Sequence, residues 1–311
     1  MKFSLVIPLA PGRNAEIIDS IKELNYPKKE YEVIVREGLN PSENRNNGAK
    51  YAKGEIMVFL DDDAVIDANF LKEAEEFFKK YKEIDIVGGA QLTPKWQRGF
   101  PKIAGYALSS KFGAWKMGTR YSLKELNLNA DETMLTSANL FCRKEVMKKI
   151  QFDTKLFPGE DPKFIEDAKK EGFNVAYSPD LILYHKRRET IRAMIKQISS
   201  YGRTRTDKES FFQTLKKPFF LIPLLFCAYL SLVLVFIILE FLKSNLIPNF
   251  ILFFPLELYL ILDLFFSFYE SVKNKNILAV FLLIFIFPLI HISYGVGMIK
   301  GYLKKNSLSK R

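Results

Sequence analysis

Short apolar runs alternate with amphipathic helical patterns from the start of the chain to about residue 190. The runs that we predict to be strands are residues 3–8, 31–35, 55–60, 84–87, 138–142, 173–177 and 181–184. Strands that alternate with helices in this way form βαβ units, in which helices cover both faces of a parallel sheet. The pattern therefore predicts an α/β fold.

Two of the intervening helices show their spacing clearly. Apolar residues recur at helical spacing from residue 17 to the Asn-Tyr-Pro sequence at 25–27, and again over residues 70–81. Residues 91–136 show no clear period but hold several aromatic side chains, as expected of loops that wall a pocket. These aromatic residues are Trp96, Tyr106, Trp115 and Tyr121.

The last third of the chain is predicted to enter a membrane. Residues 219–239 and 277–299 carry no charge, and each is long enough to cross a hydrocarbon core of about 30 Å. Residues 246–268 are also apolar, but this stretch is interrupted by polar or helix-breaking residues, so it either spans or lies in the interface. The interrupting residues are Pro248, Pro255, Glu257 and Asp263.

Basic residues flank this apolar third on both sides and prefer the cytoplasmic face of a membrane. Two full spans satisfy that preference, and three do not. We therefore expect an α/β domain at residues 1–210, a membrane region at 218–300 and a basic tail at 301–311. Residues 186–217 form a basic amphipathic segment suited to the lipid headgroup layer. One face of that segment carries Ile191, Ile195, Ile198 and Tyr201, and another carries Arg188, Arg192 and Lys196.

The charge balance supports a membrane surface as a partner. With 46 Lys and Arg against 35 Asp and Glu, the formal net charge is +11, which suits nucleic acid, anionic lipid or a sugar nucleotide. Because the basic residues gather just ahead of the apolar third, we expect membrane lipids and no nucleic acid. The only cysteines, Cys142 and Cys227, cannot build a disulfide framework or a cysteine zinc site, and a reducing setting fits. Residues 3–10 lack a basic leading region and are not expected to be a signal peptide.

The run Asp61-Asp62-Asp63 follows a predicted buried strand. Open α/β sheets bind ligands beyond the carboxyl ends of their strands, which is where these residues fall. In an extended strand end Asp61 and Asp63 point the same way and can share a divalent ion, while Asp62 faces away or holds the turn. The alternative is a solvated acidic turn in which Asp67 caps the next helix.

The sequence Arg-Asn-Asn-Gly at residues 45–48 leads into the same strand, so Arg45 or Asn46 can reach the same ligand. The alternative is a polar helix with a glycine C-cap. Together with Ser-Leu-Val-Ile-Pro at 4–8 and Phe-Leu-Asp-Asp-Asp at 59–63, this motif resembles the inverting glycosyltransferases of family 2. The resemblance covers about residues 3–205 and implies a GT-A fold, with a Rossmann-like, mostly parallel mixed sheet.

The resemblance extends to the segment 152–161, which is similar to the family's segment ending in an acidic pair. It implies that Asp161, with Glu160, supplies the catalytic base. The alternative is structural: Asp161 before Pro162 suits a helix N-cap with Pro at the first helical position, leading a helix that closes at Gly172.

The resemblance also implies roles for other residues. Donor and nucleotide contacts are expected from Pro8, Glu37, Arg45, Asn46, Asp61 and Asp62. A Mn²⁺ or Mg²⁺ ion is expected on Asp61 and Asp63, with His185 as a further ligand; alternatively, His185 is a hydrogen-bonded structural residue. Residues that close over donor and acceptor are expected to be Asn139, Gln197, Arg203 and Arg205.

Three features depart from the family's usual pattern. The second strand ends in Glu37 where many relatives have an aspartate pair, and Ala-Pro-Gly-Arg at 10–13 replaces the usual short turn. The Gln-x-x-Arg-Trp motif of processive synthases is missing, which argues for the transfer of one or few sugars. A weaker resemblance links residues 291–298 to membrane-anchored exopolysaccharide glucosyltransferases of the succinoglycan type.

The expected function is therefore sugar transfer from a UDP- or GDP-sugar to an acceptor hydroxyl, with inversion and metal assistance. The expected acceptor is a lipid-linked or cell-surface glycan, and the expected location is the cell membrane, multi-pass, with the catalytic domain on the cytoplasmic side. Rival hypotheses are a nucleotidyltransferase on a similar fold and a non-catalytic membrane scaffold that binds nucleotide or polysaccharide.

Overall fold

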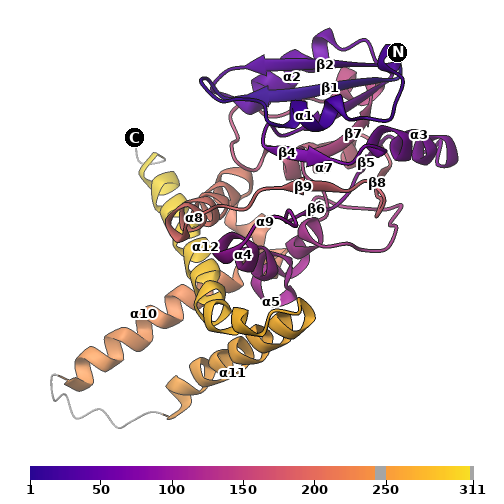
Figure 1. Cartoon of the computed structure of the whole chain (residues 1–311). Coiled ribbons are helices and arrows are strands. Elements are labelled where there is room, and N and C mark those ends of the chain that lie inside the picture. Colours follow the sequence, from indigo (N-terminus) through magenta and orange to yellow (C-terminus); the bar gives the residue numbers. More distant parts are fainter. Residues whose placement is uncertain (242–249, 309–311) are drawn as a thin grey trace. The chain divides into compact units, whose positions relative to one another are not determined.

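The computed structural model describes residues 1–241 and 250–308, which divide into two compact units (Figure 1). The first, which we call the sheet unit, comprises Met1–Gln97 and Lys116–Arg187. The second, the helical unit, comprises Arg98–Trp115 and the chain from Arg188 onwards. Residues 246–249 of the predicted middle apolar segment and residues 309–311 of the predicted tail lie outside the described residues.

The sheet unit is built on a six-stranded mixed sheet with the order β2-β1-β3-β7-β5-β8. β1 pairs in parallel with β2 and β3, β5 pairs in parallel with β8, and β7 runs antiparallel to both β3 and β5. The mixed α/β fold is thus confirmed, and every predicted strand is present with shifted ends. The strands are β1 Phe3–Leu9, β2 Tyr31–Glu37, β3 Ile56–Leu60, β5 Ile86–Gly88, β7 Asn139–Arg143 and β8 Val175–Tyr177.

A second, three-stranded sheet has the order β4-β9-β6, with β4 Ala64–Ile66, β9 Leu183–His185 and β6 Gln91–Leu92. β4 follows β3 after the three aspartates, and it pairs antiparallel with β9 so that Ala64 lies opposite His185. This register brings the end of β9 to the end of β3, although more than a hundred residues of chain separate them.

Helices cover both faces of the large sheet, as the strand composition predicts. On β3, Ile56, Val58 and Leu60 join one buried cluster, whereas Met57 and Phe59 join the other. The first cluster includes side chains of α1 and α3, and the second includes those of α2, α6 and α7. The helices are α1 Ile17–Lys22, α2 Pro41–Tyr51, α3 Phe70–Lys80, α6 Lys144–Lys149 and α7 Glu160–Lys170, with short 3₁₀ turns at Lys28–Glu30 and Trp115–Tyr121.

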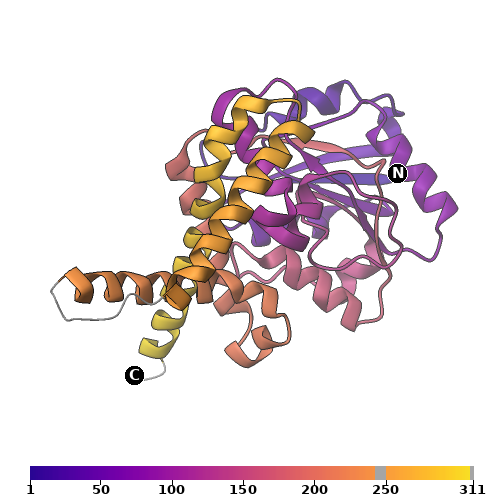
Figure 2. The same cartoon turned by 90° about the horizontal axis from the view of Figure 1, so that it is seen from below.

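The helical unit is organised around the long helix α12, Val280–Leu308 (Figure 1 and Figure 2). It packs along α8, Ile191–Lys208, and against α10, α11, α4 and α5. Glycines permit the closest approach: a Cβ on Gly202 of α8 would lie 2.1 Å from the carbonyl oxygen of Tyr294 on α12. The remaining elements are α4 Gly99–Ser109, α5 Lys111–Ala114, α9 Phe211–Leu215, 3₁₀ turns at Pro218–Phe220 and Ile277–Ala279, α10 Ile222–Phe241 and α11 Phe250–Lys273.

One expectation about local structure is wrong. Residues 99–109 form the helix α4 and not a loop, and it packs in the helical unit through side chains such as Ile103 and Ala107. On α8 the buried face carries Met194, Ile198 and Gly202, whereas Ile191 is 46% exposed. Gly202 is buried where α12 approaches, which a pattern of large apolar residues alone does not show. The suitability of α8 for the headgroup layer stays a prediction. The predicted boundary at residue 210 stays a prediction.

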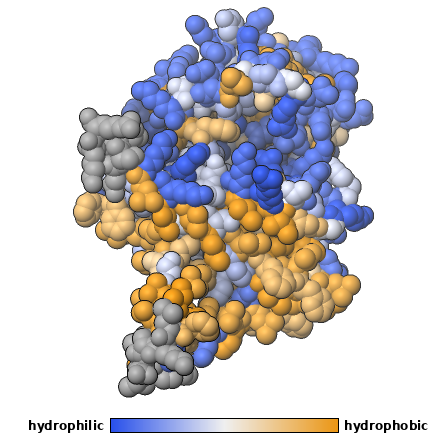
Figure 3. Space-filling view, turned by 90° about the vertical axis from the view of Figure 1, so that its left-hand side faces the viewer, coloured by the Kyte–Doolittle hydropathy of each residue, from blue (hydrophilic) through white to orange (hydrophobic). Residues whose placement is uncertain are grey.

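Three helices of the described chain are long and apolar enough to cross a membrane: Ile222–Phe241, Ile251–Lys273 and Ile277–Lys305. Their exposed surfaces differ. α10 and α11 present many exposed apolar side chains, and Figure 3 shows hydrophobic side chains gathered over this part of the helical unit. Along α12, by contrast, none of residues 286–299 is exposed, because neighbouring helices of the same unit surround them.

α11 is one continuous helix through Pro255, and four of its polar residues face the inside of the unit. Asp263 and Glu270 are 1% and 2% exposed, and Ser267 and Ser271 are fully buried. These residues recur at i, i+4, i+7 and i+8 and therefore share one helical face. Of the two charged side chains that argued against this segment as a span, Asp263 is thus turned away from the surface that lipid would contact, whereas Glu257 is exposed.

Gly48→Ala is expected to destabilise the sheet unit by about 1–2 kcal/mol, because α2 lies on β1 without room for a side chain. A Cβ on Gly48 would lie 2.4 Å from Cγ1 of Val6. The free energy of unfolding in detergent, measured with urea, checks this. Lys50→Ala, at an exposed position of the same helix, is the control. In a Val6→Ala background the cost of Gly48→Ala should shrink; an equal cost in both backgrounds would contradict the packing argument.

Candidate active site

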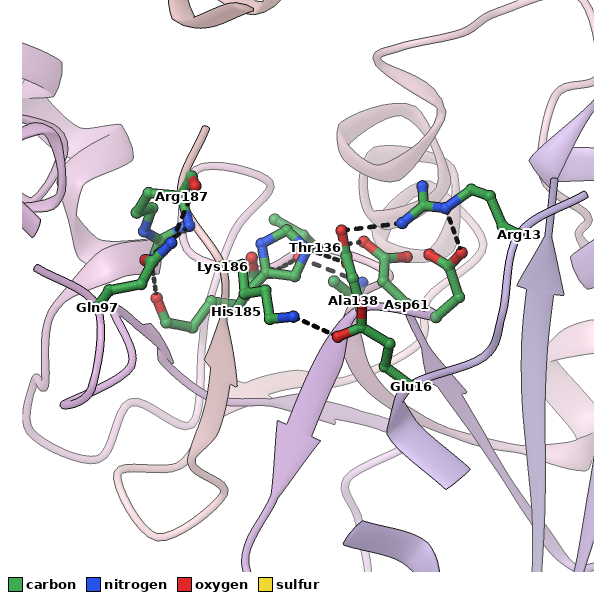
Figure 4. Close-up of polar contacts among 12 residues, drawn as sticks. Arg13, Glu16, Asp61, Gln97, Thr136, Ala138, His185, Lys186 and Arg187 are labelled. Atoms are coloured by element: carbon green, nitrogen blue, oxygen red, sulfur yellow. Dashed lines mark hydrogen bonds and ion pairs between the residues drawn. The ribbon is translucent and has the colours of Figure 1, made fainter. Parts of the chain in front are cut away.

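Asp61, Asp63 and His185 converge at the carboxyl edge of the sheets (Figure 4). One ligand atom from each of the three lies within 4.8 Å of the others. Nε2 of His185 is 2.9 Å from Oδ1 of Asp63 and 3.6 Å from Oδ2 of Asp61. The pairing of β4 with β9 positions His185. Asp61 and Asp63 lie in the turn between β3 and β4 and not in an extended strand end as predicted, and this turn brings both carboxylates to His185.

This donor set suits a divalent cation. Carboxylate oxygens favour Mg²⁺ and Mn²⁺, an imidazole nitrogen is compatible with Mn²⁺, and three protein ligands leave positions for a substrate. Burial raises the pKa of Asp63, but the hydrogen bond and charge of His185, aided by Arg13, hold it well below its usual range. Asp63 is therefore ionised at neutral pH, as a metal ligand must be.

Asp62 is turned away from this trio. Its side chain is 9% exposed, its carboxylate forms an ion pair with Arg13, and its backbone oxygen accepts a hydrogen bond from the amide of Ile17. Burial, followed by the nearby charge of Asp63, raises the pKa of Asp62 to about 6. The side chains of Asp61 and Asp63 are 27% and 17% exposed, so the aspartates do form a turn, as the alternative expected, but their carboxylates are only partly open to solvent. The cap of the next helix is Asn69, whose amide donates to Asp67.

Arg45 joins the trio to a second acidic group. Its guanidinium, 5% exposed, contacts Oδ1 of Asp61 at 3.0 Å through Nη2 and Oε1 of Glu160 at 2.9 Å through Nη1. Arg45 lies on α2, whose start is capped by Asn40: the Asn40 side chain accepts hydrogen bonds from the amides of Ser42 and Glu43. The expected polar helix is confirmed, although it ends at Ala52 and not at a glycine.

Asn46, one residue further along α2, anchors the segment that leads to the acidic pair. Its amide nitrogen donates to the carbonyl of Phe152 at 2.8 Å, and its amide oxygen accepts from the amide of Phe152 at 2.9 Å. Phe152 in turn stacks on Phe164 of α7, with ring centroids 4.3 Å apart. The structure thus gives Asn46 a positioning contact, through which α2 fixes the start of α7.

Glu160 and Asp161 occupy the first two positions of α7, and Gly159, with φ 116°, is its N-cap. The alternative role of Asp161 as the N-cap with Pro162 at the first position is therefore wrong. Oε2 of Glu160 and Oδ1 of Asp161 are buried without a hydrogen-bond partner among the described residues. Burial and the adjacent charge of Asp161, opposed by Arg45, raise the pKa of Glu160 to about 7.

Other predicted donor and acceptor residues of the sheet unit lie at the same edge or near it. Pro8 is buried in β1, and the exposed Glu37 ends β2 opposite Leu9. Asn139 begins β7 opposite Leu60, the residue before the aspartates. Its amide nitrogen donates to the carbonyls of Ala90 and Leu181, so it also ties neighbouring segments together.

Gln197, Arg203 and Arg205 belong to α8 of the helical unit. Arg203 is exposed. The guanidinium of Arg205 is engaged within its own unit, 3.1 Å from Oε1 of Glu209 and 3.4 Å from the ring centroid of Phe220. The carboxylates belong to the other unit, and the closing role of these three residues stays a prediction.

Two features of the site escaped the sequence analysis. Arg13 contacts both Asp62 and Asp63, and Lys186 forms an ion pair with Glu16 beside His185. The only signal for Arg13 was the unusual Ala-Pro-Gly-Arg turn, and nothing in the sequence marked the ion pair between Lys186 and Glu16.

A cavity of about 700 Å³ lies elsewhere in the sheet unit, lined by residues such as Leu123, Leu126 and Met134. This open pocket includes neither the four aromatic side chains of the predicted irregular segment nor the carboxylates, so the expectation that those aromatic loops wall a pocket stays a prediction.

Residues 3–200 match the model of the glycosyltransferase-like family 2. The match covers well over half of the chain, and the chain belongs to this family of transferases. It is 26% identical over 176 residues to the minor teichoic acid biosynthesis protein GgaB of Bacillus subtilis (strain 168), covering 56% of this chain and 16% of that protein. The chain thus spans only a small part of that relative.

A relative of similar length comes from Methanococcus voltae. It is dolichyl N-acetyl-alpha-D-glucosaminyl phosphate 3-beta-D-2,3-diacetamido-2,3-dideoxy-beta-D-glucuronosyltransferase, 23% identical over 322 residues, with 92% of each chain covered. Among solved structures, the mannosyltransferase PcManGT from Pyrobaculum calidifontis, in complex with GDP-Man and Mn²⁺, aligns with a TM-score of 0.56 and 12% identity. The alignment covers 98% of this chain and 88% of that one, and it shows a shared fold.

Glu160→Gln is expected to gain stability relative to the wild type as the pH rises. Because the pKa of Glu160 is raised from 4.5 to about 7, the fold favours the protonated carboxyl. The stability from this preference is complete below the unfolded pKa and is lost as the pH rises through the folded pKa. The glutamine variant cannot ionise and loses nothing in that window.

Urea unfolding in detergent at about pH 5 and about pH 8, in metal-free buffer, measures the difference between variant and wild type. Glu171→Gln, at an exposed position just after the same helix, is the control. A difference for Glu160→Gln that does not grow with pH would contradict the assignment.

Proposed function

We propose that this glycosyltransferase moves a sugar from a nucleotide-sugar donor to an acceptor hydroxyl in a single displacement with inversion. The observation that carries the proposal is the buried Arg45, which contacts Asp61 and Glu160 at once. Through Arg45, the metal-suited trio Asp61, Asp63 and His185 and the acidic pair Glu160 and Asp161, which is suited to proton transfer, share one edge of the sheet. Metal-assisted sugar transfer needs these two groups side by side.

Asp161 is proposed as the general base. Its Oδ1 is buried and has no hydrogen-bond partner among the described residues, so its lone pairs are not committed to another group of the protein. In the reaction the acceptor oxygen forms a bond to the anomeric carbon, the bond to the nucleoside diphosphate breaks, and the hydroxyl proton goes to Asp161. Glu160, hydrogen-bonded to Arg45, positions the start of α7 and hence Asp161.

Asp61, Asp63 and His185 would hold a Mn²⁺ or Mg²⁺ ion, which supplies positive charge to the departing diphosphate. The support is the donor set itself, together with the Mn²⁺ in the solved mannosyltransferase that shares the fold. The nucleotide is proposed to lie along the carboxyl ends of β1 and β2, near Pro8 and Glu37. A UDP- or GDP-sugar is the expected donor, and GDP-Man is the ligand of that same neighbour.

A lipid-linked or cell-surface glycan is the proposed acceptor. The name of the Methanococcus relative gives a dolichyl-linked sugar phosphate as its acceptor, and the Bacillus relative is named for teichoic acid biosynthesis. Apolar α10 and α11 would place the protein in the cell membrane, with basic residues keeping the catalytic part on the cytoplasmic side. A membrane-held enzyme meets a lipid-linked acceptor at high effective concentration.

Asp63→Ala is expected to weaken Mn²⁺ binding by at least about tenfold, because it removes one of three ligand groups. Electron paramagnetic resonance of free Mn²⁺ during a titration measures the affinity. Asp67→Asn, an exposed carboxylate near the same strand and outside the trio, is the matched control. Equal affinities for the two variants would rule out the trio as the metal site.

Asp161→Asn is expected to lower the transfer rate by about 10²–10⁴-fold with nucleotide binding unchanged, because only the proton acceptor is lost. Release of nucleoside diphosphate, measured over a panel of nucleotide sugars with a lipid-linked acceptor and Mn²⁺, gives the rate. Asp167→Asn on the same helix is the control. Near-wild-type transfer by Asp161→Asn would assign the base to another group and favour a binding role for the pair.

A further inference from the structure

The loop between β1 and α1 brings Arg13 to the trio Asp61, Asp63 and His185. Its residues Ala10 to Arg13 form a β-turn closed by a hydrogen bond from the amide of Arg13 to the carbonyl of Ala10, 3.1 Å. Pro11 occupies the second position, and Gly12, with φ 75°, occupies the third. This is the combination that a type II turn requires. The turn reverses the chain just beyond the sheet edge and delivers Arg13 to the aspartates.

Arg13 and His185 share the carboxylate of Asp63. Nη2 of Arg13 is 3.3 Å from Oδ2 of Asp63, whereas Nε2 of His185 is 2.9 Å from Oδ1 (Figure 4). Nε of Arg13 is also 2.9 Å from Oδ2 of Asp62. The carboxylate of Asp63 therefore lies between the guanidinium of Arg13 and the proposed position of the metal.

The same loop is held on its other side. Glu16, three residues beyond Arg13, forms an ion pair with Lys186, the residue after His185 (Figure 4). Charge pairs thus fix the loop to both strands that contribute ligands to the trio. Arg13 itself is 48% exposed, so its guanidinium can leave the aspartates for an incoming anion without crossing the core.

We propose that Arg13 binds the diphosphate of the donor and couples donor binding to metal binding. This inference rests on the proposed function and deepens it. A phosphate oxygen on the metal would lie within side-chain reach of the guanidinium, whose planar fork matches phosphate. The donor-free protein uses the same guanidinium to neutralise Asp62 and Asp63.

The two roles have opposite consequences for binding. Without a nucleotide, the positive charge of Arg13 repels a divalent cation from the trio and competes for Asp63. With a nucleotide, the diphosphate places negative charge between the metal and Arg13 and attracts both of them. Arg13 therefore weakens the binding of metal alone and strengthens the binding of the nucleotide with its metal.

The test compares Arg13→Ala with wild type in the full-length protein. Mn²⁺ alone is expected to bind more tightly to the variant, on the order of fivefold. The nucleotide probe is whichever of UDP, GDP, dTDP and CDP the wild type binds most tightly. With Mn²⁺ saturating, this nucleoside diphosphate is expected to bind the variant about 10- to 100-fold more weakly than wild type. Titration calorimetry measures both affinities.

Further variants separate this role from a structural one. Arg13→Gln can still donate a hydrogen bond to Asp62 and should show the same two shifts, whereas Arg13→Lys keeps the charge and should show smaller ones. Lys22→Ala, which removes an exposed charge from α1, should show neither. If Arg13 only held the turn, its loss would weaken both ligands together.

Failure of the inference and failure of the proposed function give different results. Wild type that binds none of the nucleoside diphosphates with Mn²⁺ would overturn the proposed function and the inference with it. Wild type that binds one of them while Arg13→Ala and Arg13→Gln bind it equally well would overturn the role of Arg13 alone. Weaker binding of Mn²⁺ to both variants would overturn the coupling.

Discussion

The buried guanidinium of Arg45 is the interaction on which the site depends. It lies between Asp61 at the end of β3 and Glu160 at the start of α7, and its side chain is almost fully removed from water. A buried charge is costly without partners, so each of the three side chains requires the other two. The chain elements that carry them are consequently held in one arrangement before any ligand binds. Such preorganisation lets charged groups act on a transition state without first moving.

Around Arg45, burial raises the pKa of two neighbouring carboxyls, but the charges beside them give the two pKa values opposite net shifts. Asp63 has His185 and Arg13 beside it, and its pKa is lowered. Glu160 has the like charge of Asp161 beside it, and its pKa is raised to about 7. At Asp63 the positive charges outweigh burial, whereas at Glu160 burial and the charge of Asp161 together outweigh Arg45. The same edge of the sheet thus carries Asp63, an anionic group suited to a cation, and Glu160, whose carboxyl holds a proton up to about neutral pH.

The apolar helices of the helical unit differ in how much of their surface is exposed. α10 and α11 expose apolar side chains, whereas residues 286–299 of α12 are enclosed by other helices of the unit. A helix that is apolar on all sides is suited either to lipid or to a protein interior, and its sequence does not distinguish them. α11 shows the converse, since its buried Asp263 and Glu270 face inwards while its exposed side is mostly apolar and carries Glu257. Charged residues within an apolar stretch therefore do not by themselves exclude contact with lipid.

The sequence by itself determined the strands of the large sheet and that helices cover both of its faces. These features follow from periodicity along a single element, with period 2 in strands and 3.6 in helices. Only the tertiary structure decided that Arg45 joins Asp61 to Glu160, that β4 brings His185 to the aspartates, and that Arg13 reaches Asp63. It also decided that residues 99–109 pack with the helical unit and that Asn46 holds the backbone of Phe152. Each of these depends on a contact between residues far apart in the chain, for which local spacing carries no signal.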